Sequence, residues 1–199
     1  MNQTLTVVLA TDNNNKAREI REILSEIDFI ERPAEFPEIQ ETGTTLYENA
    51  VLKAVAISKF TNMPALADDT GFEVEALNLA PGVFSARFAG EGSTDADNVA
   101  KVLELTKNAL NRVAYFKTVI ALAVDGDEKI VGFGTVKGTI TYEVNGTNGF
   151  GYDGIFIPDN GDGRTFGQMS ADEKNSMSHR RLALLDFRKK YTESDYLLP

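Results

Sequence analysis

A chain of 199 residues with 42% hydrophobic and 25% charged residues is typical of one or at most two soluble globular domains with a sizeable core. The absence of cysteine excludes disulfides and thiolate metal sites, and the single histidine excludes a zinc site built on several histidines, which leaves oxygen ligands for a metal such as Mg²⁺ or Mn²⁺. The net charge of −10 argues against binding of polymeric nucleic acid, but it leaves a small phosphate-bearing ligand open.

The sequence gives no sign of a membrane segment or of export. No apolar run approaches the ~20 residues of a membrane span. The start, Met1-Asn2-Gln3-Thr4, lacks the basic residues and apolar core of a signal peptide. We therefore expect no membrane partner and a cytoplasmic location.

The first elements are a strand, a polar loop and a helix. Leu5–Ala10 is β-branched and apolar, as in a buried strand, and the helix that follows carries Ile20, Ile23, Leu24 and Ile27 on one face. The loop between them, Thr11–Lys16, lies at a helix N-terminus, where free backbone N–H groups would bind an anion. Lys16 is unfavourable there unless an anion lies beside it. The alternative is an Asx-type helix cap without a ligand.

A second polar loop, Glu41-Thr42-Gly43, precedes a helix that begins at a capping box of Thr45 and Glu48. The helix is expected from about residue 46 to residue 60, with Ala50, Ala54 and Ile57 facing inward. Asn49 and Lys53 are four residues apart and share a different face, for which a solvated surface is the usual explanation.

Two adjacent carboxylates, Asp68 and Asp69, follow the short apolar segment Met63–Ala67, which predicts a buried strand that ends there. The carboxyl ends of strands are where open α/β sheets usually bind ligands. Neighbouring side chains of a strand point to opposite faces, so we expect one carboxylate to face a cleft and bind Mg²⁺ while the other holds the turn. An Asx-rich turn without chemistry is the alternative.

The middle of the chain predicts one helix and then antiparallel strands. A capping box of Thr94 and Asp97 begins a helix expected to extend through Leu110. Val113–Val124 reads as a long strand, residues 125–127 as a turn, and residues 129–142 as one or two further strands broken near Gly138. Strands joined by a tight turn are antiparallel, so the sheet is expected to be mixed.

The segment Gly149–Gly154 matches the dinucleotide pattern G-x-G-x-x-G, but residues 155–158 continue as a strand, whereas that motif requires a helix. We therefore reject a dinucleotide-binding assignment. Glycines on both sides of Phe150 would let its ring, with that of Tyr152, stack on a base. A core position for Phe150 is the alternative.

The last region begins at a capping box of Ser170 and Glu173 and continues as helix, with Leu182, Leu185 and Phe187 expected to face the core. It contains the only histidine, His179, beside Arg180 and downstream of Lys174. A lone histidine usually makes a structural hydrogen bond, but three cationic groups close together favour an anion or carbonyl site.

Taken together, the chain resembles the inosine triphosphate pyrophosphatase family, the XTP/dITP diphosphatases, from Val7 to about Leu185. Seven motifs carry the resemblance, in this order: Leu9–Lys16, Glu41–Gly43, Glu48–Ala54, Ala67–Gly71, Ala80–Gly90, Gly149–Asp153, and Glu173–Asn175 before Ser178–Arg180.

The resemblance implies a single ITPase-like α/β domain over residues 1–199, with two lobes around a long mixed sheet and a substrate groove between the lobes. It implies a homodimer and Mg²⁺-dependent hydrolysis of ITP, dITP and XTP to the monophosphate and pyrophosphate, with Mn²⁺ as a possible substitute. It also implies that Glu41 and Asp69 bind the metal and that Asp69 is the general base. The residues implied in substrate binding are Thr11, Asn13, Lys16, Lys53, Thr70, Phe150, Gly151, Tyr152, Asp153, Lys174, His179 and Arg180.

Three positions depart from the family's usual residues: Asp12 replaces Gly, Thr70 replaces Ser and Gly154 replaces Pro. Asp12 places a negative charge beside the expected phosphate loop. Two other functions therefore stay open: the same chemistry on another modified nucleotide, such as a pyrimidine, or nucleotide binding without catalysis.

Overall fold

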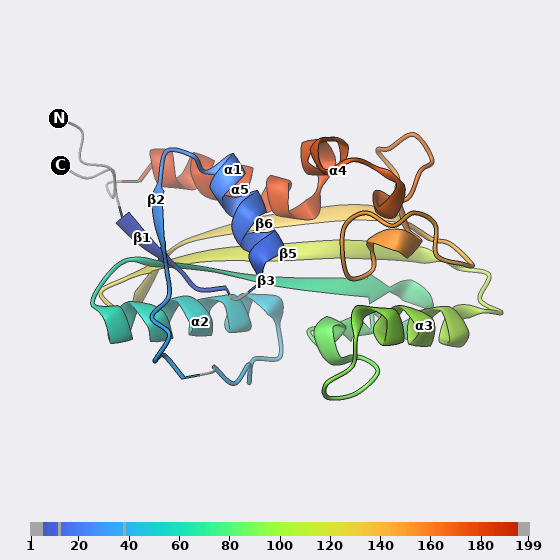
Figure 1. The fold of residues 1–199 in the computed structure, drawn as a ribbon, viewed down its shortest axis with the longest axis horizontal. Helices are drawn as coiled ribbons and strands as arrows, with labels where there is room; N and C mark the ends of the chain where they lie inside the picture. The colour runs from blue at the N-terminus through green and yellow to red at the C-terminus, as the bar shows by residue number, and fades with distance from the viewer. Residues whose placement is uncertain (1–5, 12, 38, 195–199) are drawn as a thin grey trace. The chain divides into compact units, whose positions relative to one another are not determined.

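The computed structural model describes residues 6–11, 13–37 and 39–194 (Figure 1). Its helices and strands follow one another as β1 (Thr6–Leu9), α1 (Asn14–Ile23), β2 (Asp28–Glu31), α2 (Leu46–Thr61), β3 (Ala65–Val74), β4 (Pro81–Gly82), α3 (Asp95–Thr106), β5 (Val113–Val124), β6 (Asp127–Ile140), β7 (Phe156–Pro158), α4 (Ala171–Met177) and α5 (His179–Thr192). Short 3₁₀ helices lie at η1 (Glu75–Leu77), η2 (Ser85–Arg87), η3 (Asp153–Ile155) and η4 (Phe166–Gln168).

The strands form a seven-stranded sheet in the order β2-β1-β3-β5-β6-β7, with β4 paired to β3. Strand β1 runs parallel to β2 and β3, whereas β4 and β7 run antiparallel to β3 and β6. The predicted mixed sheet with flanking helices is thereby confirmed. Strand β2 was not predicted, because its four residues, which include Asp28 and Glu31, are mostly exposed and do not alternate in polarity.

The helix starts follow from the capping residues. Helices α2, α3 and α4 each begin at the predicted capping box, with reciprocal bonds between the side chain of one residue and the backbone of the other. Helix α3 ends at Thr106, so the expectation that it extends through Leu110 is wrong, and that leucine is fully exposed in the loop that follows.

Strands β5 and β6 are joined at Asp125 and Gly126, which both have positive φ, as the tight turn predicts. Strand β6 is continuous through Gly138, so the predicted break there is absent. A Cβ at this glycine would lie 2.2 Å from the carbonyl oxygen of Ile157, so the residue allows β7 to approach β6 closely.

The chain divides into two compact units, and the first contains the residues up to Asp69, Thr118–Gly134 and those from Arg180 onward. Helices α1 and α5 pack against one face of its strands in a cluster that includes Leu9 and Leu66. Helix α2 lies on the other side of the strands from α1 and α5 (Figure 1). On α5 the residues Ala183, Leu184 and Phe187 are buried, whereas Leu182 and Leu185 are each 39% exposed, which corrects their expected core positions.

The second unit contains Thr70–Lys117 and Thr135–His179. Aromatic rings dominate its core, with edge, tilted and stacked contacts among Phe72, Phe116, Tyr152, Phe156 and Phe166. The assignment of residues 1–199 to a single domain stays a prediction. Within the described part of the chain, no helix combines the length and apolarity needed to cross a membrane.

Candidate active site

Asp68 and Asp69 lie in the middle of β3, because the strand continues through Thr70 to Val74. The predicted end of the strand at these carboxylates, and the turn there, are therefore wrong. Their side chains do alternate between the two faces: Asp68 contacts residues of α1 and α5, and Asp69 contacts a residue of α2. Both carboxylates are buried, so each requires a compensating charge.

Asp68 belongs to a group of four charged side chains in the first unit. Its Oδ2 atom is 3.0 Å from Lys16 Nζ and 3.6 Å from Arg180 Nε, and the Arg180 guanidinium also donates to Glu19. Burial would raise the pKa of Asp68, but Lys16, Arg180 and Lys53 lower that pKa to about 2. Arg180 has no exposed surface, so its contacts join α5 to α1 and β3, and its predicted contact with a base is not supported by this arrangement.

The start of α1 is capped by Asn13. Its Oδ1 atom accepts from backbone N–H groups of the first turn, including that of Lys16 at 3.2 Å, and Thr11 Oγ1 accepts from the N–H of Asn13. The Asx-type cap is thus present, and the anion beside Lys16 is the carboxylate of Asp68. Phosphate binding by this loop stays a prediction, and Asp12 lies outside the described residues.

Lys53 on α2 bridges the two predicted metal ligands. Its Nζ atom donates to Glu41 Oε1 at 2.8 Å and to Asp69 Oδ1 at 3.0 Å. Burial alone would lower the pKa of Lys53, but Asp69, Asp68 and Glu41 raise it above its ordinary value. Burial raises the pKa of Asp69, and Glu41 adds to this rise while Lys53 opposes it. The second oxygen of Asp69, Oδ2, is buried and has no hydrogen-bond partner within residues 6–11, 13–37 and 39–194.

Helix α2 also positions the loop that carries Glu41. The N–H of Gly43 donates to Asn49 Oδ1 at 2.8 Å, and a Cβ at Gly43 would lie 2.6 Å from that oxygen, so only glycine fits. Asn49 is fully buried and only 13% of the Lys53 side chain is exposed, so the solvated-face interpretation of this pair is wrong. Asn49 was not predicted as a site residue. The feature of the sequence that could have indicated it is a polar side chain one helical turn before Lys53.

The donor set suits a hard divalent cation. Glu41 and Asp69 supply carboxylate oxygens, and Asp69 Oδ2, to which no described residue donates, is a further oxygen acceptor in the same place. Over residues 6–11, 13–37 and 39–194, no group of three or more His, Asp or Glu side chains is arranged to hold a metal. Mg²⁺ usually takes one or two protein carboxylates and completes its ligands with water and substrate phosphates, and its binding here stays a prediction.

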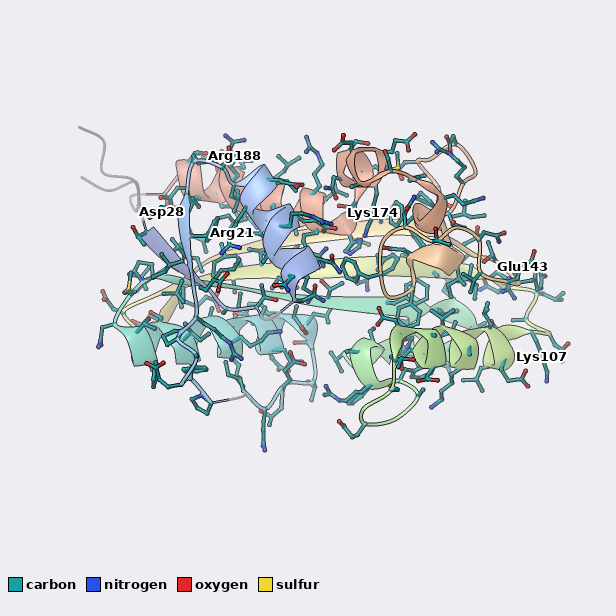
Figure 2. All side chains as sticks on the ribbon, in the orientation of Figure 1. Arg21, Asp28, Lys107, Glu143, Lys174 and Arg188 are labelled. Atoms are coloured by element: carbon teal, nitrogen blue, oxygen red, sulfur yellow. The ribbon has the colours of Figure 1, made fainter. Side chains whose placement is uncertain are left out.

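A second cluster, in the second unit, surrounds Phe150. Asp153 Oδ2 accepts from the Phe150 N–H at 2.9 Å and from Lys174 Nζ at 2.7 Å. The Lys174 ammonium, on the α4 residue labelled in Figure 2, lies 4.6 Å from the centre of the Phe150 ring. Gly149 has φ +76°, and a Cβ there would lie 2.1 Å from the Asp153 carboxylate. Asp153 is therefore occupied in holding Phe150 and Lys174, and the contact of either residue with a base stays a prediction.

Tyr152 is a core residue of the second unit. Its ring stacks on Phe72 with centroids 4.5 Å apart, and its hydroxyl donates to the carbonyl of Ser85 at 2.9 Å. Burial raises the pKa of Tyr152 above its ordinary range. Its expected stacking on a base is therefore not supported. The N–H of Gly151, which precedes Tyr152, donates to Asp95 Oδ2 at 2.8 Å, and the sequence did not predict this contact.

His179 and Thr70 are the remaining predicted substrate-binding residues of the second unit. The His179 ring is buried and stacks on Phe116 with centroids 4.5 Å apart and an angle of 8° between the planes. Thr70, directly after Asp69 in β3, is partly exposed. Ligand contact by either residue stays a prediction.

The departure at Gly154 has a packing reason. This residue lies in η3, where a Cβ would lie 2.9 Å from Val144 Cγ1, and a Cβ on Gly167 would lie 2.8 Å from Gly154 Cα. The two glycines therefore allow close contact between η3 and η4. Strand β7 follows directly, which confirms the rejection of a dinucleotide-binding helix at this motif.

The first unit also has a cavity of about 200 Å³ beside the start of α1. Thr11, Asn14 and Arg21 line it from one side, and Glu31 and Arg32 line it from the end of β2. Thr11 is the one predicted site residue that it includes.

The chain is similar to known proteins over most of its length. The model of the Ham1 family matches residues 7–190. A "dITP/XTP pyrophosphatase" of Desulfotalea psychrophila is 45% identical over 186 residues, which are 92% of this chain and 83% of that protein. A protein of the same name from Coxiella burnetii is 46% identical over 189 residues, 90% of this chain and 93% of that protein.

Solved structures give the same result for the fold. The structure of a HAM1 protein from Coxiella burnetii superposes with a TM-score of 0.88 at 43% identity and covers 96% of this chain and 100% of that chain.

Proposed function

This chain belongs to the Ham1 family, and from that premise we propose that it hydrolyses deaminated purine nucleoside triphosphates, namely ITP, dITP and XTP, to the monophosphate and pyrophosphate. The main support for the proposal is that Glu41 and Asp69 both form ion pairs with the ammonium of Lys53. This arrangement combines oxygen ligands for a cation with a positive group for phosphate. The relatives of this chain are named dITP/XTP pyrophosphatases.

The first unit is proposed to bind the triphosphate and the metal. Thr11, Asn13, Lys16 and Lys53 are assigned to the phosphates, and Glu41 and Asp69 to Mg²⁺. Bound Mg²⁺ would neutralise phosphate charge and polarise a phosphoryl oxygen. Asp69 Oδ2 accepts no hydrogen bond from the residues that the structure describes, so it is assigned to accept a proton from the attacking water.

The second unit is proposed to bind the base. Phe150 supplies a ring for stacking, and Lys174 and His179 supply donors for the carbonyl at position 6 of hypoxanthine or xanthine. Adenine has an amino group at that position, so it would leave these donors unpaired, which is a costly mismatch. We assign Asp153 to positioning Phe150 and Lys174, and Arg180 to positioning Asp68, because both side chains are buried and already paired.

Product analysis tests the function. The protein is incubated with Mg²⁺ and dITP, XTP, dATP or dGTP, and pyrophosphate is distinguished from orthophosphate. Pyrophosphate from dITP and XTP alone is expected. Hydrolysis of a modified pyrimidine nucleotide in preference to dITP, or nucleotide binding without turnover, would replace the proposal by one of the two alternative functions.

Replacement of the proposed proton acceptor is the sharper test. Asp69→Asn keeps the shape of the side chain but removes its basicity, so pyrophosphate release should fall by about 10²–10⁴-fold. Nucleotide binding, measured by calorimetry, should be kept within a few-fold. Turnover close to the wild-type rate would show that another group accepts the proton.

We further propose a cytoplasmic homodimer without a membrane or polymeric nucleic-acid partner, because the resemblance implies a dimer and the net charge of −10 disfavours polyanions. Sedimentation equilibrium should give twice the 21.8 kDa of one chain. A mass of one chain across the micromolar range would contradict the dimer.

A further inference from the structure

Lys53 lies where a metal ion would meet both of its predicted protein ligands. One ammonium contacts Glu41 Oε1 at 2.8 Å and Asp69 Oδ1 at 3.0 Å, and so joins carboxylates from a loop and from β3. Phosphate binding alone would not require Lys53 to form ion pairs with two carboxylates.

The arrangement is buried and supported. Only 13% of the Lys53 side chain and 9% of the Asp69 side chain are exposed. Asn49, one turn earlier on the same helix, holds the loop that carries Glu41. Helix α2 therefore carries Lys53 and also holds the loop of one of its carboxylate partners, Glu41.

The ammonium and a divalent cation would compete for the same oxygens. Mg²⁺ requires oxygen ligands at about 2.0–2.1 Å, and a second positive charge directly beside it would be repelled. If the metal uses Glu41 Oε1 and Asp69 Oδ1, Lys53 must turn away from at least one of them. Lys53 is flexible enough to do so, because its charge is carried on a four-carbon stem.

We propose that Lys53 is the resident cation of the metal-free site, and that its ammonium leaves the two carboxylates for the substrate phosphates when the metal binds. The identity of the nucleotide in this inference rests on the proposed function. The consequence is cooperative binding: phosphates draw the ammonium away and free the carboxylates, so metal and nucleotide each increase the affinity for the other.

The first test measures Mn²⁺ affinity without nucleotide, by electron paramagnetic resonance of free Mn²⁺. If a competitor occupies the site, the apparent affinity for the metal is the intrinsic affinity multiplied by the fraction of protein that is free of the competitor. Lys53→Met and Lys53→Ala should therefore bind Mn²⁺ more tightly than wild type, by about tenfold or more. Unchanged or weaker binding by both folded variants would overturn the proposal.

Lys16→Met is the matched control. It removes one positive charge from the first unit but leaves the ammonium between Glu41 and Asp69 in place. Its Mn²⁺ affinity should rise less than that of the Lys53 variants. An equal rise would show that net charge, and not the position of Lys53, controls the affinity, which would overturn the proposal. Thermal unfolding establishes that each variant is folded.

The second test needs only wild-type protein as its starting point. Mn²⁺ affinity is measured with and without dITP carrying a non-hydrolysable α,β-imido bridge, after correction for Mn²⁺ bound by free nucleotide. The nucleotide should increase the affinity for Mn²⁺, and the increase should be about tenfold smaller in Lys53→Met. The absence of any increase in wild type, or an equal increase in the variant, would overturn the proposal.

These measurements separate the two proposals. Product analysis decides whether the wild-type protein releases pyrophosphate, whereas Mn²⁺ binding without nucleotide reports only on the carboxylates and Lys53. A protein without turnover that still shows tighter Mn²⁺ binding in the Lys53 variants would disprove the function and keep the inference.

Discussion

Adjacent residues of β3 serve different faces of the sheet, and this separates their chemistry. Asp68 is held by Lys16 and Arg180, which lower its pKa to about 2 after the opposing effect of burial, so it remains a fixed negative charge. Asp69 has a raised pKa, since burial outweighs the effect of Lys53, and its Oδ2 atom has no hydrogen-bond partner in the described part of the chain. The first carboxylate is therefore suited to structure and the second to proton transfer.

A carboxylate of the second unit gives a pH-dependent prediction. Glu173 accepts from Arg164 at 2.7 Å and from the Ser170 N–H at 2.8 Å, and these bonds lower its pKa from 4.5 to about 2. Because the pKa of Glu173 is lower in the folded protein than its ordinary 4.5, ionised Glu173 stabilises the folded state fully above pH 4.5. This stabilisation is lost as the pH falls toward 2. Thermal unfolding should show Glu173→Gln less stable than wild type at pH 7, with the difference shrinking between pH 4.5 and 2.

The control for this prediction is Asp172→Asn, which removes a negative charge from the same helical turn. It should change the unfolding temperature less than Glu173→Gln at pH 7. A difference for Glu173→Gln that stays constant down to pH 2 would contradict the assignment.

At the scale of elements, α2 links fold and site through Asn49. Asn49→Ala would remove the acceptor of the partly buried N–H of Gly43, which should cost about 1 kcal/mol of unfolding free energy in urea titrations. The loop that carries Glu41 would loosen, so Mn²⁺ affinity should fall as well. Ser58→Ala removes a comparable acceptor, for Gly126, from the same helix, and it should lower stability but keep Mn²⁺ affinity.

The N-terminus of α3 positions the loop around Phe150. Asp95 accepts a hydrogen bond from the N–H of Gly151. Asp95→Ala should therefore raise the KM for dITP by about tenfold, which corresponds to the loss of one hydrogen bond to a charged group. The kcat should stay nearly unchanged. Asp97→Ala in the capping box of the same helix should lower stability and leave KM unchanged. Equal effects of both changes on KM would show that helix stability, and not the loop contact, matters.

The elements that the sequence predicts well are those with local signals. Capping boxes fix the starts of α2, α3 and α4, and β-branched residues fix both ends of β5. The end of β3 could not be predicted, because Asp68-Asp69-Thr70-Gly71 reads as a turn unless the cations from α1, α2 and α5 are known. The site shows the same limit: the motifs predict Glu41, Lys53 and Asp69, but Asn49 and Asp95 act through backbone contacts that only the fold brings together.

At the scale of the whole molecule, each unit is assembled from separate stretches of chain. The first unit needs residues from the beginning, middle and end of the sequence, and the second needs two segments. Contacts between such distant segments are slow to form, and a truncated chain would lack part of a core. Tests of either cluster therefore require the full chain.

The net charge of −10 predicts a salt effect on substrate capture. A nucleoside triphosphate is repelled at long range, and raising KCl from about 20 to about 200 mM shortens the Debye length from about 20 to about 7 Å. At fixed free Mg²⁺, kcat/KM for dITP should rise severalfold with salt while kcat stays constant. A fall in kcat/KM would show that the local lysines, and not the whole-molecule charge, control the approach.

Arg180 has a consequence for how variants at this position would be observed in a living cell. It is fully buried between Glu19 and Asp68, and removal of one partner of a buried ion pair costs about 3–5 kcal/mol, close to the whole stability of many domains. Cellular proteases and chaperones act on the unfolded fraction that such a loss creates. A substitution at Arg180 would therefore act mainly by lowering the amount of folded protein in the cell. A genetic screen would score it as a null allele, even though the residues assigned to the metal and the base are unchanged.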